Sequence, residues 1–176
     1  MQTVILCGGR GTRLGRESEV RPKPLVNVGD RPILWHIMKQ YASYGHTDFV
    51  LCLGYLGDEI KDYFLHYDAR QNDITLQLGS PSDITTHSEH AEKNWRVTLS
   101  NTGRDANTGA RLKRVERYIT DQTFMMTYGD GLSSIDLKKL EEFHRSHGKL
   151  ATVSAVHPPD APGISFFSSD FIPSLL

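Results

Sequence analysis

Apolar and polar residues follow one another in blocks along the chain, and these blocks predict strands and helices in turn. Residues 3–7 (TVILC) and 49–55 (FVLCLGY) are short, continuous apolar runs that end in glycine or polar residues. Such runs are typical of parallel strands that are covered on both faces. We therefore expect both runs to lie at the centre of a sheet.

Between and after these runs, apolar residues recur at the spacing of a helix. Residues 31–45 predict a crossover helix with Pro32 in its first turn and Gly45 as its stop, and residues 57–67 predict a second helix with an acidic first turn. Two further helices are expected over 110–119 and 135–148, the latter with Asp136 as N-cap and Gly148 as stop. The remaining strands are expected over 73–78, 95–100, 124–131 and 150–156.

This alternation predicts an α/β fold with a doubly wound, mostly parallel sheet. The segment 79–94 between two of the strands is polar and loop-like, and we interpret it as a lid or a subunit-contact arm. Its HSEHAE stretch (87–92) contains histidines and carboxylates that could be interpreted as metal ligands. We favour a solvated polar segment, because nothing else at zinc-site spacing accompanies it.

Composition narrows the function classes. The 176 residues suit one domain, and a net charge of −1 provides no overall positive field for a nucleic acid or an anionic membrane. No apolar stretch approaches a membrane span, and no signal peptide precedes the first strand, so a cytoplasmic protein is predicted. Cys7 and Cys52 lie within apolar runs and are expected to be buried thiols in a reducing compartment.

The first strand runs into a glycine-rich, basic loop, VILCGGRGTRLG (4–15). In open α/β sheets, ligands bind beyond the carboxyl ends of the strands, and glycines there let backbone N–H groups approach phosphate oxygens. A hydroxyl and two cations stand among the glycines, so the loop predicts a nucleoside triphosphate site formed by Gly8, Gly9, Arg10, Gly11, Thr12 and Arg13. The loop is neither a dinucleotide fingerprint, since Leu14 stands where a third small residue is needed, nor a P-loop, since the Gly-Lys-Ser/Thr ending is absent.

Two further stretches converge on the same edge. In RPKPLV (21–26), Lys23 stands between prolines, which predicts a lysine on a stiff, extended loop suited to a phosphate. In YGDG (128–131), a strand ends in Asp130 between two glycines. Asp130 is positioned to hold Mg²⁺, although a turn aspartate is an equal interpretation.

The stretches LCGGRGTRLG, RPKPLV and YGDG together resemble the nucleotidyltransferase domain, of GT-A-like fold, of enzymes that activate sugar 1-phosphates. Five more stretches narrow the resemblance to the glucose-1-phosphate cytidylyltransferases: PILWHIMKQY, LGYLGDEIKDYF, WRVTLSNTG, TGARLKRV and MTYGDG. The similarity covers residues 1–159. Enzymes of this family make CDP-glucose for bacterial surface polysaccharides such as O-antigen, so the resemblance implies CTP and glucose 1-phosphate as substrates and Mg²⁺ as cofactor.

The resemblance also implies roles for individual residues. The nucleotide would be held by the backbone of Leu6, Cys7, Gly8 and Gly9 and by the side chains of Thr12 and Arg13. Further substrate contacts would come from Thr108, Gly109, Arg111 and Gly129, and Asp130 would bind Mg²⁺. Arg13 and Lys23 would be catalytic, offsetting charge as a sugar-phosphate oxygen attacks the α-phosphorus and pyrophosphate leaves. Arg10 stands where the family usually has an apolar residue, and it is interpreted equally as a phosphate contact or a solvent-facing side chain.

Members of the family are considerably longer, and residues 160–176 resemble nothing in them. We therefore expect an incomplete nucleotidyltransferase domain over 1–159 and a divergent tail over 160–176. Two alternatives stay open: the same fold using dTTP or UTP, and a catalytically inactive nucleotide-binding fragment. Homo-oligomerisation and the activity of the chain itself are also left open.

Overall fold

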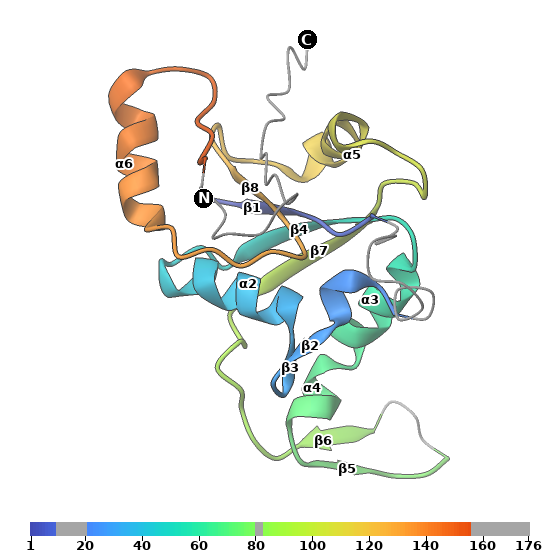
Figure 1. Cartoon of the computed structure of the whole chain (residues 1–176). Helices are drawn as coiled ribbons and strands as arrows, with labels where there is room; N and C mark the ends of the chain where they lie inside the picture. The colour runs from blue at the N-terminus through green and yellow to red at the C-terminus, as the bar shows by residue number, and fades with distance from the viewer. Residues whose placement is uncertain (10–20, 80–82, 156–176) are drawn as a thin grey trace.

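The centre of the molecule is a sheet of four parallel strands. The structure, a computed structural model, describes residues 1–9, 21–79 and 83–155. The strands lie in the order β7-β4-β1-β8, with bounds Arg96–Asn101, Asp48–Leu53, Thr3–Leu6 and Met125–Tyr128 (Figure 1). Ile5 lies opposite Leu51 on one side and Thr127 on the other. The two apolar runs predicted to be central strands are therefore confirmed as β1 and β4.

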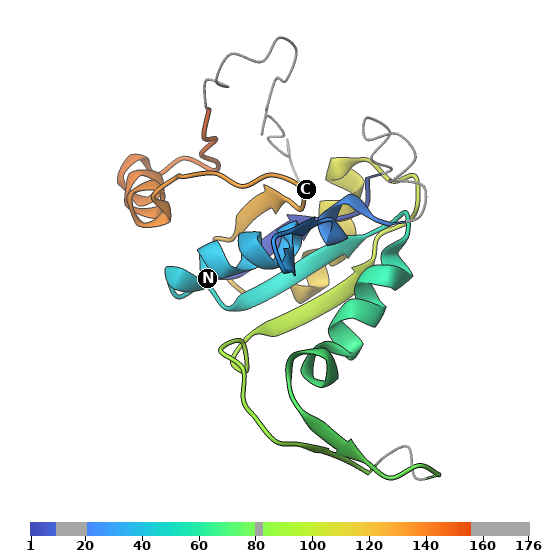
Figure 2. The same cartoon turned by 60° about the horizontal axis from the view of Figure 1, so that its bottom comes forward.

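Helices cover both faces of this sheet. Alternate residues of a strand point to opposite faces, so Ile5 and Leu51 pack in one cluster while Val4 and Val50 pack in another. The first cluster is covered by α2 (Ile33–Ser43), α3 (Gly57–Leu65) and the start of α6 (Leu137–His147), and the second by α5 (Thr108–Val115), as Figure 2 shows from a second side. The doubly wound α/β prediction is confirmed.

Local signals place several helix ends where they were predicted. Asp136 caps α6, accepting hydrogen bonds from the backbone N–H groups of Lys138 and Lys139, and Gly148 ends the helix with a φ of 62°. Gly45, with a φ of 88°, follows the end of α2. Pro32 is the N-cap of α2 and not part of its first turn, because its ψ of 150° is still extended.

The chain between these main elements forms short ones. They are η2 (Lys23–Leu25), β2 (Asn27–Val28), β3 (Arg31–Pro32), α4 (Tyr67–Gln71), β5 (Ile74–Leu76), β6 (Ile84–Thr86) and η3 (Glu116–Tyr118). β5 and β6 pair antiparallel in a hairpin that projects beyond α4 in both views (Figures 1 and 2). The prediction of a plain loop over 79–94 therefore missed β6, whose pairing with β5 supplies backbone hydrogen bonds that its polar sequence does not reveal.

The HSEHAE stretch is only partly solvated. Glu92 is buried and accepts a hydrogen bond from Lys39 Nζ at 3.1 Å, and His90 Nε2 lies 2.6 Å from Asp68 Oδ1. These contacts fold the stretch back onto α2 and α4, which corrects the prediction of a solvated segment at these two residues. The described ranges hold no group of three or more His, Cys, Asp or Glu side chains arranged to bind a metal.

The strand predicted over 150–156 is wrong for residues 150–155, which adopt no regular structure. Leu150 is 95% exposed and Val153 is 49% exposed. An apolar run becomes a strand only where a neighbouring strand accepts its backbone hydrogen bonds and other elements cover its faces. Residue 156 and the predicted tail 160–176 lie outside the described residues. Among the described helices, none is long and apolar enough to cross a bilayer.

Candidate nucleotide site

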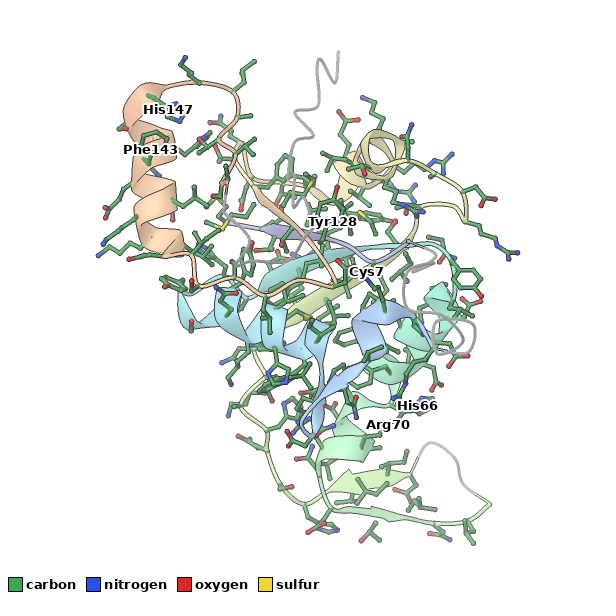
Figure 3. All side chains as sticks on the ribbon, in the orientation of Figure 1. Cys7, His66, Arg70, Tyr128, Phe143 and His147 are labelled. Carbon is green, nitrogen blue, oxygen red and sulfur yellow. The ribbon has the colours of Figure 1, made fainter. Side chains whose placement is uncertain are left out.

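The predicted site residues that the structure describes gather at the carboxyl edge of the sheet. All four strands are parallel, so the segments that follow β1, β4, β7 and β8 leave the sheet at the same edge. Figure 3 labels Cys7, the residue after β1, and Tyr128, the last residue of β8, at this edge. Predictions for Arg10, Gly11, Thr12 and Arg13 lie outside the described residues and stay predictions.

The segment that follows β1 is anchored to its neighbours by backbone hydrogen bonds. Cys7 N donates to Cys52 O at 3.0 Å, and Gly129 N donates to Leu6 O at 3.0 Å. Gly9 is exposed, and a Cβ at its position would have no heavy atom within 4 Å. Leu6, Cys7, Gly8 and Gly9 therefore lead from the buried sheet to the surface, as a phosphate-binding turn requires.

Arg111 occupies the centre of this edge. Its side chain is only 6% exposed, and burial lowers the pKa of its guanidinium. The two terminal nitrogens of the guanidinium donate to five oxygens: Leu53 O at 3.1 Å, Thr102 Oγ1 at 2.9 Å, Gly103 O at 2.8 Å, Gly8 O at 2.9 Å and Arg104 O at 3.3 Å. One buried cation thus ties the last residue of β4 to the segments that follow β1 and β7.

Two glycines make room for this guanidinium. A Cβ on Gly8 would lie 2.1 Å from Arg111 Nη1, and a Cβ on Gly54 would lie 2.5 Å from the same atom. Sequence reasoning assigned Arg111 to substrate contacts, which stays a prediction, and missed these protein contacts. The available signal was a glycine within two residues of the end of each of two neighbouring strands, at Gly8 and Gly54.

Lys23 and Asp130 meet at the same edge. Lys23 Nζ lies 3.0 Å from Asp130 Oδ2, and the two side chains are 26% and 40% exposed. Lys23 begins the 3₁₀ turn η2, in which Leu25 N donates to Pro22 O at 2.8 Å. The prediction of an extended loop at Lys23 is therefore wrong, because proline fixes φ near −65°, a value that suits the start of a helical turn as well as extended chain.

Gly129 explains how Lys23 reaches Asp130. A Cβ at Gly129 would lie 2.8 Å from Cys7 Sγ and 3.2 Å from Pro24 Cγ. The missing side chain lets η2 pack directly against the end of β8, which brings the neighbours of Pro24 and Gly129 together. Lys23 and Asp130 are those neighbours.

The chemistry of Asp130 fits a magnesium ligand. Its carboxylate is a hard oxygen donor, it is partly exposed, and it lies in the turn that follows β8 between two glycines. Magnesium in nucleotide enzymes is usually held by one or two carboxylates together with substrate phosphates and water. Asp130 could supply one such ligand at this edge.

Thr108 and Gly109 form the first turn of α5, close in sequence to Arg111. Asn107 caps this turn by accepting a hydrogen bond from Ala110 N at 2.8 Å. Gly109 is exposed and Thr108 is half-buried. The structure thus joins their segment to the candidate site through the Arg111 side chain, while their own contacts with substrate stay predictions.

Two surface hollows share no residue with this cluster. One, of about 470 Å³, is lined by residues of β3, α3 and α4, including Arg31, Asp62 and Arg70. The other, of about 520 Å³, lies between α4, β7 and the segment that carries His90 and Glu92. Neither hollow combines glycine-rich backbone with a lysine and a carboxylate, so the carboxyl edge is the candidate site.

Comparison with known proteins points to one family. The sequence profile of the nucleotidyl transferase family matches residues 2–166. The glucose-1-phosphate cytidylyltransferase of Salmonella typhimurium is 47% identical over 160 residues, which cover 90% of this chain and 62% of that protein. The probable glucose-1-phosphate cytidylyltransferase of Bacillus subtilis is 44% identical over 156 residues, which cover 89% of this chain and 60% of that protein.

A solved structure supports the same assignment. HddC from Yersinia pseudotuberculosis, complexed with GMP-PN, superposes with a TM-score of 0.60 at 26% identity, over 81% of this chain and 53% of that one. The chain spans about three fifths of the length of the two curated relatives, 62% and 60%. Because the family profile covers nearly all of the sequence, this chain belongs to the nucleotidyl transferase family.

Proposed function

We propose that this chain is a nucleotidyltransferase of the glucose-1-phosphate cytidylyltransferase type, which transfers the cytidylyl group of CTP to glucose 1-phosphate. The choice of CTP and glucose 1-phosphate is supported by the similarity to the Salmonella and Bacillus proteins, at 47% and 44% identity. The observation that carries a phosphate-transfer chemistry is the meeting of Lys23 and Asp130, 3.0 Å apart, beside the segment that follows β1.

The proposed reaction is a single in-line displacement. A phosphate oxygen of glucose 1-phosphate forms a bond to the α-phosphorus of CTP, and the bond between that phosphorus and the bridging oxygen to the β-phosphate breaks. Pyrophosphate leaves with the electron pair, and CDP-glucose remains. No side chain needs to form a covalent intermediate, so positioning and charge neutralisation provide the catalysis.

The residues of this edge divide these tasks. The glycines of the segment after β1 let backbone N–H groups approach the phosphates, and Lys23 neutralises the negative charge of the triphosphate and of the leaving pyrophosphate. Arg13, assigned by resemblance, would add a second cation. Asp130 would hold Mg²⁺, which supplies Lewis-acid neutralisation of phosphate charge when it is bound. Arg111 orients the edge by holding the carbonyl of Gly8.

The proposal includes a cellular setting. We infer a cytoplasmic enzyme from the sequence pattern, which predicts neither a membrane span nor a signal peptide. Dependence on Mg²⁺ and a role in making activated sugars for O-antigen are inferred from the resemblance to the cytidylyltransferases.

The test is a comparison of nucleotides with the full chain. Binding of CTP, UTP, dTTP and GTP is measured by calorimetry with Mg²⁺ present, and products with glucose 1-phosphate are identified by ³¹P NMR. We expect CTP to bind most tightly and CDP-glucose to be the product. Tighter binding of UTP or dTTP would favour the same fold with another base, and binding without any product would favour an inactive nucleotide-binding fragment.

A further inference from the structure

We propose that Lys23 and Asp130 hold each other in the ligand-free protein and exchange partners together when a metal–nucleotide complex binds. Lys23 passes to the triphosphate, and Asp130 passes to the cation. This inference rests on the proposed function, because that function is what assigns a phosphate to Lys23 and Mg²⁺ to Asp130. Its consequence is that the metal and the triphosphate bind well together and each binds less well alone.

The geometry makes this pair specific. Lys23 Nζ donates to Asp130 Oδ2 at 3.0 Å across 107 residues of sequence. The backbone on both sides is well anchored: Val26 N donates to Lys23 O at 3.0 Å within η2, and Gly129 N donates to Leu6 O at the end of β8. The close approach of Pro24 to Gly129 holds the two segments together. The contact therefore follows from the packing of the site and not from two flexible surface side chains that meet by chance.

The charges explain why the exchange is coupled. A free divalent cation approaching Asp130 meets a carboxylate that Lys23 already neutralises, and a free triphosphate approaching Lys23 meets an ammonium group that Asp130 already neutralises. A metal–triphosphate complex offers each side chain a replacement partner at once. Because both side chains are partly exposed, at 26% and 40%, the pair itself is weak and is broken at small cost.

If the two side chains exchange partners in this way, Lys23→Met should change the affinities for metal and for phosphate in opposite directions. Methionine keeps an unbranched side chain and removes the charge. Affinity for Mn²⁺ alone, a hard cation with the oxygen preference of Mg²⁺ that can be followed by EPR, should rise by up to about fivefold as Asp130 is released. Affinity for inorganic triphosphate should fall by about tenfold to a hundredfold, since a charge-assisted contact is lost.

Asp130→Asn gives the reciprocal result. Mn²⁺ binding at this edge should be lost, while calorimetry in EDTA should show affinity for inorganic triphosphate rising by up to about fivefold, because Lys23 is released. General repulsion between Asp130 and the anion would also raise this affinity, so the double variant separates the two causes. In the Lys23→Met background, Asp130→Asn should raise triphosphate affinity by a smaller factor than it does in the wild-type chain.

A matched control removes the same charge elsewhere. Lys93 pairs with Glu89 in the segment that follows β6, and Lys93→Met should change neither affinity. An unchanged or lower Mn²⁺ affinity in Lys23→Met, or no Mn²⁺ binding by either wild type or Lys23→Met, would overturn the exchange. So would an equal effect of Asp130→Asn in both backgrounds. Both inorganic probes lack a base and a sugar, so they remain informative even if the chain shows no preference for CTP and the proposed function fails.

Discussion

Gly8→Ala tests whether the hydrogen bonds of the Arg111 guanidinium organise the candidate site. We call this group the Arg111 cluster: Arg111 with Gly8, Leu53, Thr102, Gly103 and Arg104. The three heavy atoms nearest to a Cβ at Gly8 all belong to the Arg111 guanidinium, at 2.1, 2.3 and 2.8 Å. The end of an arginine side chain can usually move aside, but this one is buried and hydrogen-bonded to the carbonyls of Leu53 and Gly8. The added methyl group should therefore break some of the hydrogen bonds of the Arg111 cluster.

The size of the effect follows from the bonds at risk. Hydrogen bonds to a charged group contribute about 1.5–3 kcal/mol each, and alanine recovers about 0.4–1 kcal/mol through the unfolded state. Losing two of the guanidinium contacts should therefore lower the free energy of unfolding by about 2–6 kcal/mol, a large share of the roughly 5–15 kcal/mol typical of a domain. Urea denaturation followed by circular dichroism measures this difference directly.

A double-mutant cycle decides the cause. If the methyl group acts by displacing the guanidinium, Gly8→Ala should cost little in an Arg111→Ala background, where no guanidinium remains to displace. Gly131→Ala is the matched control, because a Cβ there would have no heavy atom within 4 Å and its φ is not positive. Gly8→Ala as stable as wild type, or costs that simply add in the double variant, would refute the reasoning.

Three further predictions concern the buried cysteines, the cap of α6 and His46. Cys7 and Cys52 are buried, and burial raises both thiol pKa values, that of Cys52 to about 12. Neither thiol should therefore react with a disulfide reagent at pH 8 until urea unfolds the chain. Rapid reaction of the folded protein would contradict this. Asp136→Ala should remove the cap of α6 and lower the free energy of unfolding by about 0.5–2 kcal/mol, while Asp136→Asn should retain most of it. Burial lowers the pKa of His46, so the folded state favours the neutral ring. The free energy of unfolding that this residue contributes is fully present above about pH 6.5, the pKa of an unperturbed histidine. It should be lost as the pH falls through the lower pKa of the folded state. His46→Gln should flatten the fall in melting temperature below pH 6.5, and an unchanged pH profile would exclude His46 as its source.

The sequence alone determined the elements whose causes are local. The strands β1 and β4 could be predicted without knowing their neighbours, because a continuous apolar run is typical of a strand that is buried on both faces. Asp136 and Gly148 marked the ends of α6 for the same reason, since a cap acts on backbone groups within a few residues. The glycine-rich loop, Lys23 and Asp130 could be assigned to one edge because parallel strands end on the same side of a sheet.

Only the tertiary structure decided which of these groups touch. Arg111 reaches Gly8 across 103 residues and Lys23 reaches Asp130 across 107, and such contacts depend on the order of the strands and on the packing of Pro24 against Gly129. Residues 150–155 show the converse, since an apolar run with strand propensity forms no strand where none of the described strands pairs with it. Propensity and periodicity act over a few residues, whereas the pairing of side chains at the candidate site is set by which distant segments the folded sheet brings to one edge.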